Sequence, residues 1–399
     1  MKLWDKGGQL DAAIERFTVG DDPQLDLELL PYDCAGSRAH ARGLHRIGLL
    51  TDDELAALEQ ELAAIAADAE AGRIVIPPDL EDGHTYIEDR LTRVVGEAGK
   101  KIHAGRSRND QVLTALRLLQ RDRLAGLRTA VDGLREALAG LDRRAGAVPL
   151  PGFTHTRKAM PSSVGLWAQA WRDALADDLE LLAGLERLLD RSPLGTGAGY
   201  GVPLPFDRAF TAAEMGFGGV QENPIHAQLT RGKYELAIVQ WLTQVMLDIN
   251  RLATDAIWFS LPEFGWFRLP DRFCTGSSLM PQKQNPDVLE LARAALHVVT
   301  GCQQRIQGIV GNQISGYHRD LQWTKQPLLE ALRLTRDTLA VMTAVVDGLI
   351  IDEARCRAAM TDELYATHRA CELVRQGVPF REAYRQVAAS LARPAGPAG

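Results

Sequence analysis

Apolar residues recur every three or four positions over several unusually long stretches of the chain. The first stretch covers residues 109–144, where leucine, alanine and valine alternate with charged residues. Stretches with the same period begin at Pro161, near residue 231, at Pro286 and near Gln326. This period is that of an amphipathic helix. The pattern therefore predicts helices of roughly 25 to 35 residues, and helices of this length are most readily buried in a bundle.

Strand signals are scarce by comparison. The apolar alternation of residues 73–77 is the one short piece that predicts a strand, so the predicted fold class is mainly α. We expect a helical N-terminal domain at residues 1–100, a central long-helix bundle at residues 101–345 and a short helical C-terminal domain at residues 346–399. The proline- and glycine-rich residues 392–399 are expected to fray.

The central helical stretches are apolar on more than one face. Trp167 and Trp171, which are spaced by four residues in the second stretch, illustrate this. A single chain would leave such surface exposed to water. The pattern therefore favours association between copies of the chain.

The composition is that of an ordinary globular protein. The 399 residues are 46% hydrophobic and 24% charged, and the formal net charge is −7. The negative charge and the scattered basic residues argue against nucleic acid as a partner. No run approaches the roughly 18 apolar residues of a membrane span, and the N-terminus lacks a secretory signal. We therefore expect a cytoplasmic protein with no membrane partner.

The five cysteines are far apart and show no spacing typical of a disulfide framework or a zinc site. They are Cys34, Cys274, Cys302, Cys356 and Cys371. We therefore expect free thiols and no metal site.

Residues 275–290 place a hydroxyl-rich loop directly before a helix. A glycine and two serines open the loop, and Lys283 follows them. Asn285, Pro286 and Asp287 then form a helix-start signal, with the asparagine expected as the N-cap and the proline as the first helical residue. A helix N-terminus beside a lysine is a ready site for an anion. A glycine and two serines alone more often form a plain hinge. Only the full sequence of residues 275–290 is specific enough to indicate a function.

Several segments of the sequence, residues 275–290 among them, resemble one known family of proteins. The segments from Gly105 to Gln111 and from Gly152 to Ser163, together with residues 275–290, resemble the argininosuccinate lyase family of the fumarase/aspartase superfamily. Shorter matches occur at Ser192–Gly201, Gln228–Lys233 and Tyr317–Lys325. All of these matches fall in the family's order, so the resemblance extends over almost the whole chain.

This resemblance implies a fold, a reaction and an assembly. Superfamily members are long-helix bundles that assemble as homotetramers and release fumarate from succinyl-bearing substrates. For this chain the resemblance implies cleavage of argininosuccinate to arginine and fumarate by β-elimination, in arginine biosynthesis, with no metal or organic cofactor. The segments around residues 107, 155, 277 and 317 lie at the ends of different long helices. Each active site is therefore expected to be shared between chains.

The resemblance also assigns catalytic roles. Ser277 is the base, acting as an alkoxide whose formation is favoured by Lys283, by loop N–H groups and by a helix N-terminus. Lys283 and Asn285 would grip the carboxylate of the substrate. His155 is the candidate acid, and Glu290 would pair with it, fix its tautomer and raise its basicity. The sequence leaves open which group protonates the leaving nitrogen.

A second set of residues resembles substrate contacts. These residues are Ser107, Asn109, Thr154, Arg231, Tyr317, Gln322, Lys325 and, in the N-terminal domain, His84. Arg108 and Asp110 resemble structural supports. Asn109 and Asp110 also fit a plain helix cap, and the two functions can coexist.

The chain departs from the family pattern at several positions. Arg157 and Lys158 stand where the family has glutamine and arginine, and Gln284 stands where lysine is frequent. Residues 19–21 replace an asparagine, an alanine and a serine. None of these changes touches the catalytic set, so they bear on the identity of the substrate.

Two other functions remain open at this point. One is a fumarate-releasing lyase of the same superfamily that acts on another succinyl adduct, such as adenylosuccinate. The other is a non-catalytic structural protein of the crystallin kind, which the intact set of Ser277, Lys283 and His155 disfavours. A fumarate-release assay separates these possibilities.

Overall fold

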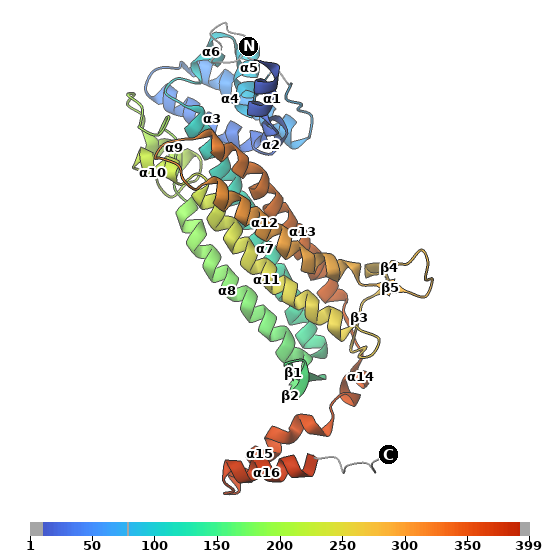
Figure 1. Ribbon diagram of the computed structural model, residues 1–399. Coiled ribbons are helices and arrows are strands. Elements are labelled where there is room, and N and C mark those ends of the chain that lie inside the picture. The colour runs from blue at the N-terminus through green and yellow to red at the C-terminus, as the bar shows by residue number, and fades with distance from the viewer. Residues whose placement is uncertain (1–10, 78–79, 392–399) are drawn as a thin grey trace. The chain divides into compact units, whose positions relative to one another are not determined.

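The computed structural model describes residues 11–77 and 80–391 (Figure 1). The chain divides into two compact units. The first unit comprises Met1–Arg128, Glu180–Thr243 and His297–Leu334, and the second comprises Thr129–Leu179, Gln244–Leu296 and Thr335–Gly399. The domain boundaries expected near residues 100 and 345 stay a prediction. Residues 392–399, which we expect to fray, lie outside the described residues.

Each of the long apolar-periodic stretches forms a helix. These helices are α7 (Arg108–Ala145), α8 (Val164–Leu189), α11 (Lys233–Phe259), α12 (Asp287–Ile309) and α13 (Lys325–Gly348). The prediction of a mainly helical protein with long helices is confirmed. Their buried stripes carry the expected apolar residues, for example Leu175 and Leu182 on α8 and Leu242 and Ile249 on α11.

Two of these helices begin later than the sequence indicated. The hydroxyl of Ser163 accepts the N–H of Leu166 at 3.1 Å, so α8 is capped by Ser163 and Pro161 belongs to a strand. At α12 the carbonyl of Pro286 accepts the N–H of Leu289 at 2.9 Å, which makes the proline the N-cap. Such shifts arise because the cap, and not the apolar period, sets the first residue of a helix.

The first unit contains the remaining N-terminal helices. They are α1 (Ala12–Val19), α2 (Asp22–Leu25), η1 (Asp26–Glu28), α3 (Leu30–Arg46), α4 (Asp52–Glu70), α5 (Gly83–Val95) and α6 (Glu97–Lys101). Helix α4 starts with a capping box in which Thr51 and Glu54 satisfy each other's backbone N–H groups. Leu44, Leu58 and Leu91 are fully buried and join α3, α4 and α5 in one apolar core. Short helices α9 (Arg208–Glu214), α10 (Pro224–Leu229) and η3 (Arg319–Thr324) complete this unit.

The strand predicted at residues 73–77 is wrong. The alternation itself is real, since Ile74 and Ile76 are buried in the N-terminal core and Val75 is 79% exposed. The segment is extended, but the described chain supplies no neighbouring strand to pair with it. A strand requires a partner, and the local pattern does not reveal one.

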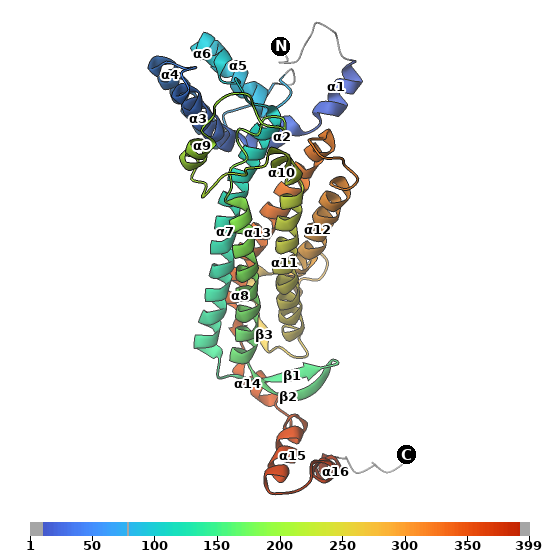
Figure 2. The same cartoon turned by 90° about the vertical axis from the view of Figure 1, so that its left-hand side faces the viewer.

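The second unit contains three antiparallel strand pairs that the sequence did not predict. They are β1 (Pro149–Thr154) with β2 (Arg157–Ser163), β3 (Phe267–Arg268) with β6 (Ile350–Ile351), and β4 (Thr275–Gly276) with β5 (Gln284–Asn285). Figure 2 shows the first pair as a hairpin between α7 and α8. Prolines and a glycine within this hairpin hid it, because they are depleted in ordinary strands.

The last part of the second unit is a set of short helices. They are η2 (Asp271–Phe273), α14 (Glu353–Ala358), η4 (Asp362–Tyr365), α15 (Ala366–Arg375) and α16 (Phe380–Leu391). Ala370, Ala383 and Val387 form a small core between α15 and α16. Within residues 11–77 and 80–391, the structure contains no helix long and apolar enough to cross a membrane. The five cysteines are free thiols, as expected.

Candidate active site

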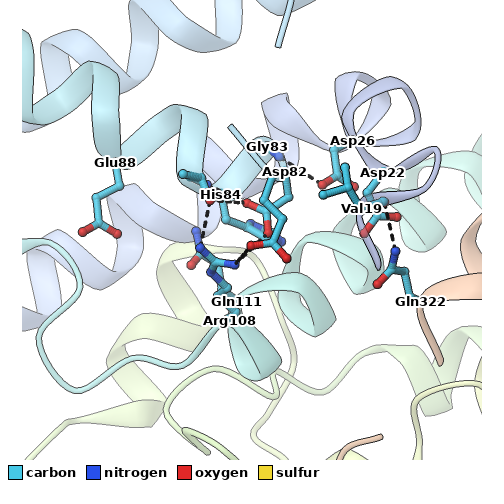
Figure 3. A network of polar contacts seen from close by, with 12 residues as sticks. Val19, Asp22, Asp26, Asp82, Gly83, His84, Glu88, Arg108, Gln111 and Gln322 are labelled. Carbon is cyan, nitrogen blue, oxygen red and sulfur yellow. Dashed lines mark hydrogen bonds and ion pairs between the residues drawn. The ribbon is translucent and has the colours of Figure 1, made fainter. Parts of the chain in front are cut away.

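A cavity in the first unit, here termed the polar cavity, gathers six of the predicted substrate contacts: His84, Asn109, Arg231, Tyr317, Gln322 and Lys325. Its volume is about 150 Å³. The other lining residues are Asp22, Asp26, Glu81, Asp82, Arg108, Val112 and Arg319. Figure 3 shows much of this cluster, to which residues far apart in the sequence contribute. The motifs at residues 84, 109, 231 and 317–325 therefore meet at one place.

Lys325 lies between two carboxylates of the N-terminal segment. Its ammonium is 2.6 Å from Asp26 and 2.7 Å from Asp22, and its side chain is 3% exposed. Burial lowers the pKa of Lys325, but the charges of Asp26 and Asp22 outweigh burial and raise the pKa above its ordinary value. Lys325 is therefore charged, and two carboxylates for one ammonium leave this part of the cavity with a surplus of negative charge.

His84 forms a buried pair with Asp33. The Nδ1 atom of His84 hydrogen-bonds to the carboxylate of Asp33, and both side chains are almost inaccessible. Burial lowers the pKa of His84, but the charge and hydrogen bond of Asp33 reverse the effect and raise it. The amide of Gln111 donates to the same carboxylate at 2.9 Å. The hydrogen bond to Asp33 holds the Nδ1 edge of the imidazole, and His84 also lines the polar cavity.

Arg231 is the unsatisfied cation of the polar cavity. The residue is only 4% exposed, and its guanidinium lies over the ring of Tyr317 at 5.1 Å. Its Nε and Nη1 atoms have no hydrogen-bond partner within the described part of the chain. A buried guanidinium with unused N–H groups is costly unless an anion meets it. The position therefore suits a carboxylate of a bound ligand.

Ser107 and Asp110 fix the start of α7. The hydroxyl of Ser107 accepts the N–H of Asn109 at 3.2 Å, and the carboxylate of Asp110 accepts the N–H of Ser107 at 2.9 Å. Ser107 is therefore the cap, two residues before the predicted Asn109. Asp110 is fully buried and also accepts the N–H of Gly197 at 2.9 Å, although burial raises its pKa to about 6. This arrangement leaves the Asn109 side chain available to line the cavity.

Two further lining residues hold the cavity wall together. The guanidinium of Arg108 pairs with Glu81 at 3.3 Å and with Asp82 at 3.2 Å, as Figure 3 shows for Asp82. Arg319 reaches the other oxygen of Glu81 at 2.7 Å. Glu81 thereby joins the start of α7 to η3. Arg108 contacts protein groups, and the supporting role expected for it stays a prediction.

Gln322 is hydrogen-bonded to its own chain at both ends of its amide. Its Nε2 atom donates to the carbonyls of Thr18 and Val19 at 3.1 Å each, and its Oε1 accepts from Arg319 at 3.0 Å. Figure 3 shows the contact with Val19. Val19, the first of the three residues where the chain departs from the family pattern, is therefore bonded to a predicted substrate contact through its backbone carbonyl.

The loop carrying Ser277 lies in the second unit between β4 and β5. The Oγ atom of Ser277 accepts the N–H of Met280 at 3.1 Å and is 3.4 Å from that of Leu279. The side chain is half-buried at the base of the loop, whereas Leu279 at the tip is 84% exposed. N–H groups directed at Oγ stabilise negative charge on that oxygen. The loop thus provides part of the environment expected for an alkoxide.

The base of this loop is tied to the elements around it. Thr275 pairs with Asn285 across β4 and β5, and its hydroxyl donates to Asp287 in the first turn of α12. Gln284, where the family often has lysine, donates to Asp271 of η2 at 3.3 Å. Lys283 is exposed on the loop. Gln284, which replaces the lysine frequent in the family, therefore helps to hold the base of the loop in place.

His155 occupies the tip of the hairpin formed by β1 and β2. Thr154 pairs with Arg157, so His155 and Thr156 form a two-residue turn. Both turn residues have positive φ, at 51° and 59°. This conformation is the one required by a type I′ turn, which usually takes asparagine or glycine. The imidazole is exposed at the end of the hairpin.

The two unassigned cations next to His155 have different environments. The ammonium of Lys158 donates to the carbonyl of Ala359 at 3.0 Å and to the hydroxyl of Thr361 at 2.9 Å. Lys158 thereby joins the hairpin to the segment before η4. Arg157 is exposed and makes no hydrogen bond or ion pair with any described residue. Of the two cations, only Arg157 is available to a ligand.

The structure does not pair His155 with Glu290 inside one chain. Glu290 is exposed in the first turn of α12, and no hydrogen bond or ion pair joins it to His155 within the described residues. Ser277, Lys283, Asn285, Glu290, Thr154 and His155 belong to the second unit. The polar cavity and Ser107 belong to the first. The expected pairing of His155 with Glu290 thus stays a prediction.

Sequence reasoning missed several residues of the polar cavity. Asp22, Asp26, Glu81 and Arg319 all line it and form its ion pairs. One signal was available, since Asp22 and Asp26 are four residues apart and share a helical face. Nothing in the local sequence showed that Lys325, some three hundred positions away, would lie between them.

Comparison with known proteins assigns this fold and these motifs to a class of enzymes. A family model described as lyase matches residues 7–301. That match covers well over half of the chain, so the chain belongs to the lyase family.

Two relatives and one solved structure show which lyases this chain is similar to. The argininosuccinate lyase of Thermotoga neapolitana is 48% identical over 98% of this chain and 98% of its own length. The argininosuccinate lyase of Sorangium cellulosum is 49% identical over 100% of this chain and 93% of its own length. A solved structure of an EDDS lyase variant with bound fumarate has a TM-score of 0.81 at 27% identity, covering 96% of this chain and 76% of that one. The resemblance inferred from the motifs is confirmed.

Proposed function

We propose that this protein cleaves argininosuccinate to arginine and fumarate by β-elimination, as a step of arginine biosynthesis. Its similarity to argininosuccinate lyases over nearly their whole length supports this function. The structural observation that carries the chemistry is the environment of Ser277, whose Oγ accepts the N–H of Met280 at 3.1 Å. A serine held in this way can lose its proton more easily than a free serine.

The difficult step is removal of a proton from carbon next to a carboxylate. That carbon acid is very weak, so the negative charge that develops must be met by donors already in place. We assign Ser277 as the base and Lys283 and Asn285 as the groups that bind the adjacent carboxylate. As the proton moves to Ser277, the C–N bond breaks, fumarate forms and the guanidine nitrogen of arginine leaves with the electron pair.

The leaving nitrogen requires a proton, and His155 is our candidate donor. Its place at a hairpin tip exposes the imidazole and lets it reach a bound ligand. Glu290 is assigned as its partner, which would set the tautomer of the imidazole. A general acid of this kind typically contributes about 10²- to 10⁴-fold in rate.

The polar cavity supports an amino acid as the leaving part of the substrate. It offers an unsatisfied guanidinium at Arg231 and a surplus carboxylate at Asp22 and Asp26. A zwitterionic ligand meets both needs, because its carboxylate can bind the arginine and its cationic groups can bind the acidic side. We assign this cavity, with Asn109, Tyr317, Gln322, Lys325 and His84, to substrate binding. We assign Ser107 and Thr154 to the same task outside it.

The assembly is part of the proposal. Apolar side chains such as Leu166, Leu181 and Trp258 are between 47% and 60% exposed on α8 and α11. Such surface on long helices supports a homotetramer, in which different chains contribute segments to each active site. We also propose that the protein acts in the cytoplasm, where free cysteines are stable.

A direct test compares two substrates. The purified protein is incubated with argininosuccinate or with adenylosuccinate, and fumarate is followed by its absorbance. We expect kcat/KM for argininosuccinate to be at least about a hundredfold higher, a gap of roughly 2.7 kcal/mol in transition-state binding. Fumarate from adenylosuccinate alone would reject the assignment, and no fumarate from either would favour a structural protein or another adduct.

One observation bears on the alternative function, a related lyase that acts on another succinyl adduct. Arg157 is an exposed cation two residues from His155, and the described residues supply no anion for it. If this arginine faced the leaving group, its charge would disfavour a guanidinium and favour an acidic adduct. Arg157→Gln separates the two cases. A kcat/KM for argininosuccinate within about threefold of wild type keeps argininosuccinate as the substrate, whereas a large gain points to another natural adduct.

A further inference from the structure

The turn that carries His155 has an unusual composition. Two-residue hairpin turns with positive φ at both central positions are normally built from asparagine and glycine, which tolerate that region. Here the two positions are His155 with φ 51° and Thr156 with φ 59°. A β-branched residue is a particularly poor choice in the left-handed region. Thr156 therefore stands where glycine would form the same turn with less strain.

The hairpin arms are anchored on both sides of this turn. On β1 the ring of Phe153 packs against Trp266, with centroids 5.9 Å apart. On β2 the ammonium of Lys158 is bonded to the carbonyl of Ala359 and to Thr361. These contacts fix where the arms end. They leave the direction of His155 to be set by the two turn residues themselves.

Thr156 makes one contact that glycine cannot make. Its hydroxyl donates to the carbonyl of His155 at 2.6 Å. This bond restrains the peptide group that joins the two residues, and with it the direction in which the Cα–Cβ bond of His155 leaves the backbone. Thr156 also lines an apolar cavity of about 520 Å³ together with Phe153 and Trp266. The hydrogen bond to the carbonyl of His155 thus restricts rotation of the Thr156 side chain.

We propose that Thr156 is a positioning residue, which holds the hairpin tip in its left-handed conformation and thereby directs the imidazole of His155 toward the reacting atoms. The inference rests on the proposed function, in which His155 serves the elimination. Strain kept at a residue next to a reacting group is common where orientation matters more than stability. In this proposal Thr156 acts through His155 and takes no part in the proton transfer itself.

The experiment compares variants that keep the turn but change the hydroxyl. Thr156→Gly and Thr156→Asn tolerate positive φ and lose the hydroxyl, whereas Thr156→Ser keeps it. We expect the glycine and asparagine variants to lose about tenfold to a hundredfold in kcat, the effect of a misplaced reacting group, with KM within about twofold. Their melting temperatures should equal or exceed that of the wild type. Thr156→Ser should restore kcat to within about threefold.

Two controls separate this inference from its alternatives. Asn312→Gly changes the remaining non-glycine position with positive φ in the described chain and should leave kcat unchanged. His155→Asn keeps a residue suited to the turn and removes the imidazole. If His155→Asn loses activity while Thr156→Gly and Thr156→Asn keep wild-type kcat, the positioning role is overturned and the proposed function stands. If His155→Asn itself keeps full activity, the role of His155 fails, and that of Thr156 fails with it.

Discussion

At the scale of single residues, Ser277 is the base that we propose, and the backbone around it bears on that role. A free serine hydroxyl is too weak an acid to serve as a base in its ionised form. In the loop between β4 and β5 the N–H groups of Met280 and Leu279 are directed at its oxygen. The neighbouring Ser278 is exposed, and no N–H group of the described residues donates to its hydroxyl. The two adjacent serines are therefore a matched pair for a test.

We predict that Ser277→Ala lowers kcat by at least about a thousandfold, the scale of losing an essential acid–base group. Ser278→Ala should retain activity within about threefold. Because neither hydroxyl lies in the core, both variants should melt at the wild-type temperature. The measurement is fumarate release together with a thermal melt. Wild-type activity in Ser277→Ala would remove this residue from the role of base.

The second prediction at this scale concerns Arg231. Two nitrogen atoms of its buried guanidinium, Nε and Nη1, have no hydrogen-bond partner among the described residues, so we assign Arg231 to ligand binding and not to stability. We expect Arg231→Gln to raise KM at least about tenfold, which corresponds to the roughly 1.5–3 kcal/mol of a charge-assisted hydrogen bond. The melting temperature of the ligand-free protein should stay the same or rise.

Arg117 is the control for this prediction. It is also buried, but its guanidinium donates to the carbonyl of Arg191 and to the hydroxyl of Thr230, both at 3.1 Å. Arg117→Gln should therefore lower the melting temperature clearly, because it leaves those acceptors unsatisfied. If Arg231→Gln lowers the melting temperature as much as Arg117→Gln does, Arg231 is a structural residue.

At the scale of elements, the helices and strands differ in how well the sequence predicted them. The apolar period found the five long helices, because a helix satisfies its own hydrogen bonds within a short stretch of chain. It misplaced the starts of α8 and α12, which depend on the caps Ser163 and Pro286. It missed the strand pairs, because a strand forms only beside another strand. The wrong strand at residues 73–77 has the same cause.

One pair of helices carries a pH-sensitive contact. Asp178 on α8 is buried, and burial followed by the charges of Asp248 on α11 and of Asp177 raises its pKa to about 7. An aspartate in the unfolded chain titrates near 4. A pKa raised on folding means that the stabilising contribution is present below about pH 4 and is lost as the pH rises through about 7.

We therefore predict that Asp178→Asn raises the melting temperature at pH 8 and that this advantage shrinks steadily toward pH 4. The reason is that the asparagine removes the cost of ionising a buried carboxyl group beside other carboxylates. Melting curves from pH 4 to pH 8 measure the effect. Asp173→Asn, at an exposed position on the same helix, is the control and should show little change. A difference between Asp178→Asn and wild type that does not depend on pH would contradict this account.

At the scale of the whole molecule, the remaining prediction is about assembly. We expect a homotetramer by light scattering. If each active site takes segments from several chains, two inactive variants can complement each other. His155→Asn and Ser277→Ala, mixed, dissociated and reassembled, should recover part of the wild-type activity, because some sites then receive both intact residues. A monomer, or mixtures that stay inactive at every ratio, would contradict shared sites.

What the sequence determined by itself was of two kinds. The apolar period determined the long helices, and the motifs at residues 105–111, 152–163 and 275–290 identified the family and its candidate base and acid. Both signals are local, because each is read within one turn of a helix or within one loop. They needed no knowledge of which distant segments meet.

The tertiary structure decided which charges face one another. Lys325 is paired with Asp22 and Asp26 across some three hundred positions, and His84 is paired with Asp33. Among the described residues, Nε and Nη1 of Arg231 have no hydrogen-bond partner. The tertiary structure also placed Lys158 against the segment around Ala359 and left Arg157 exposed, although the two cations are neighbours in the sequence. Burial and ion pairing depend on the surroundings in three dimensions, where a few ångströms change the free energy of a charge. No pattern along the chain contains those distances.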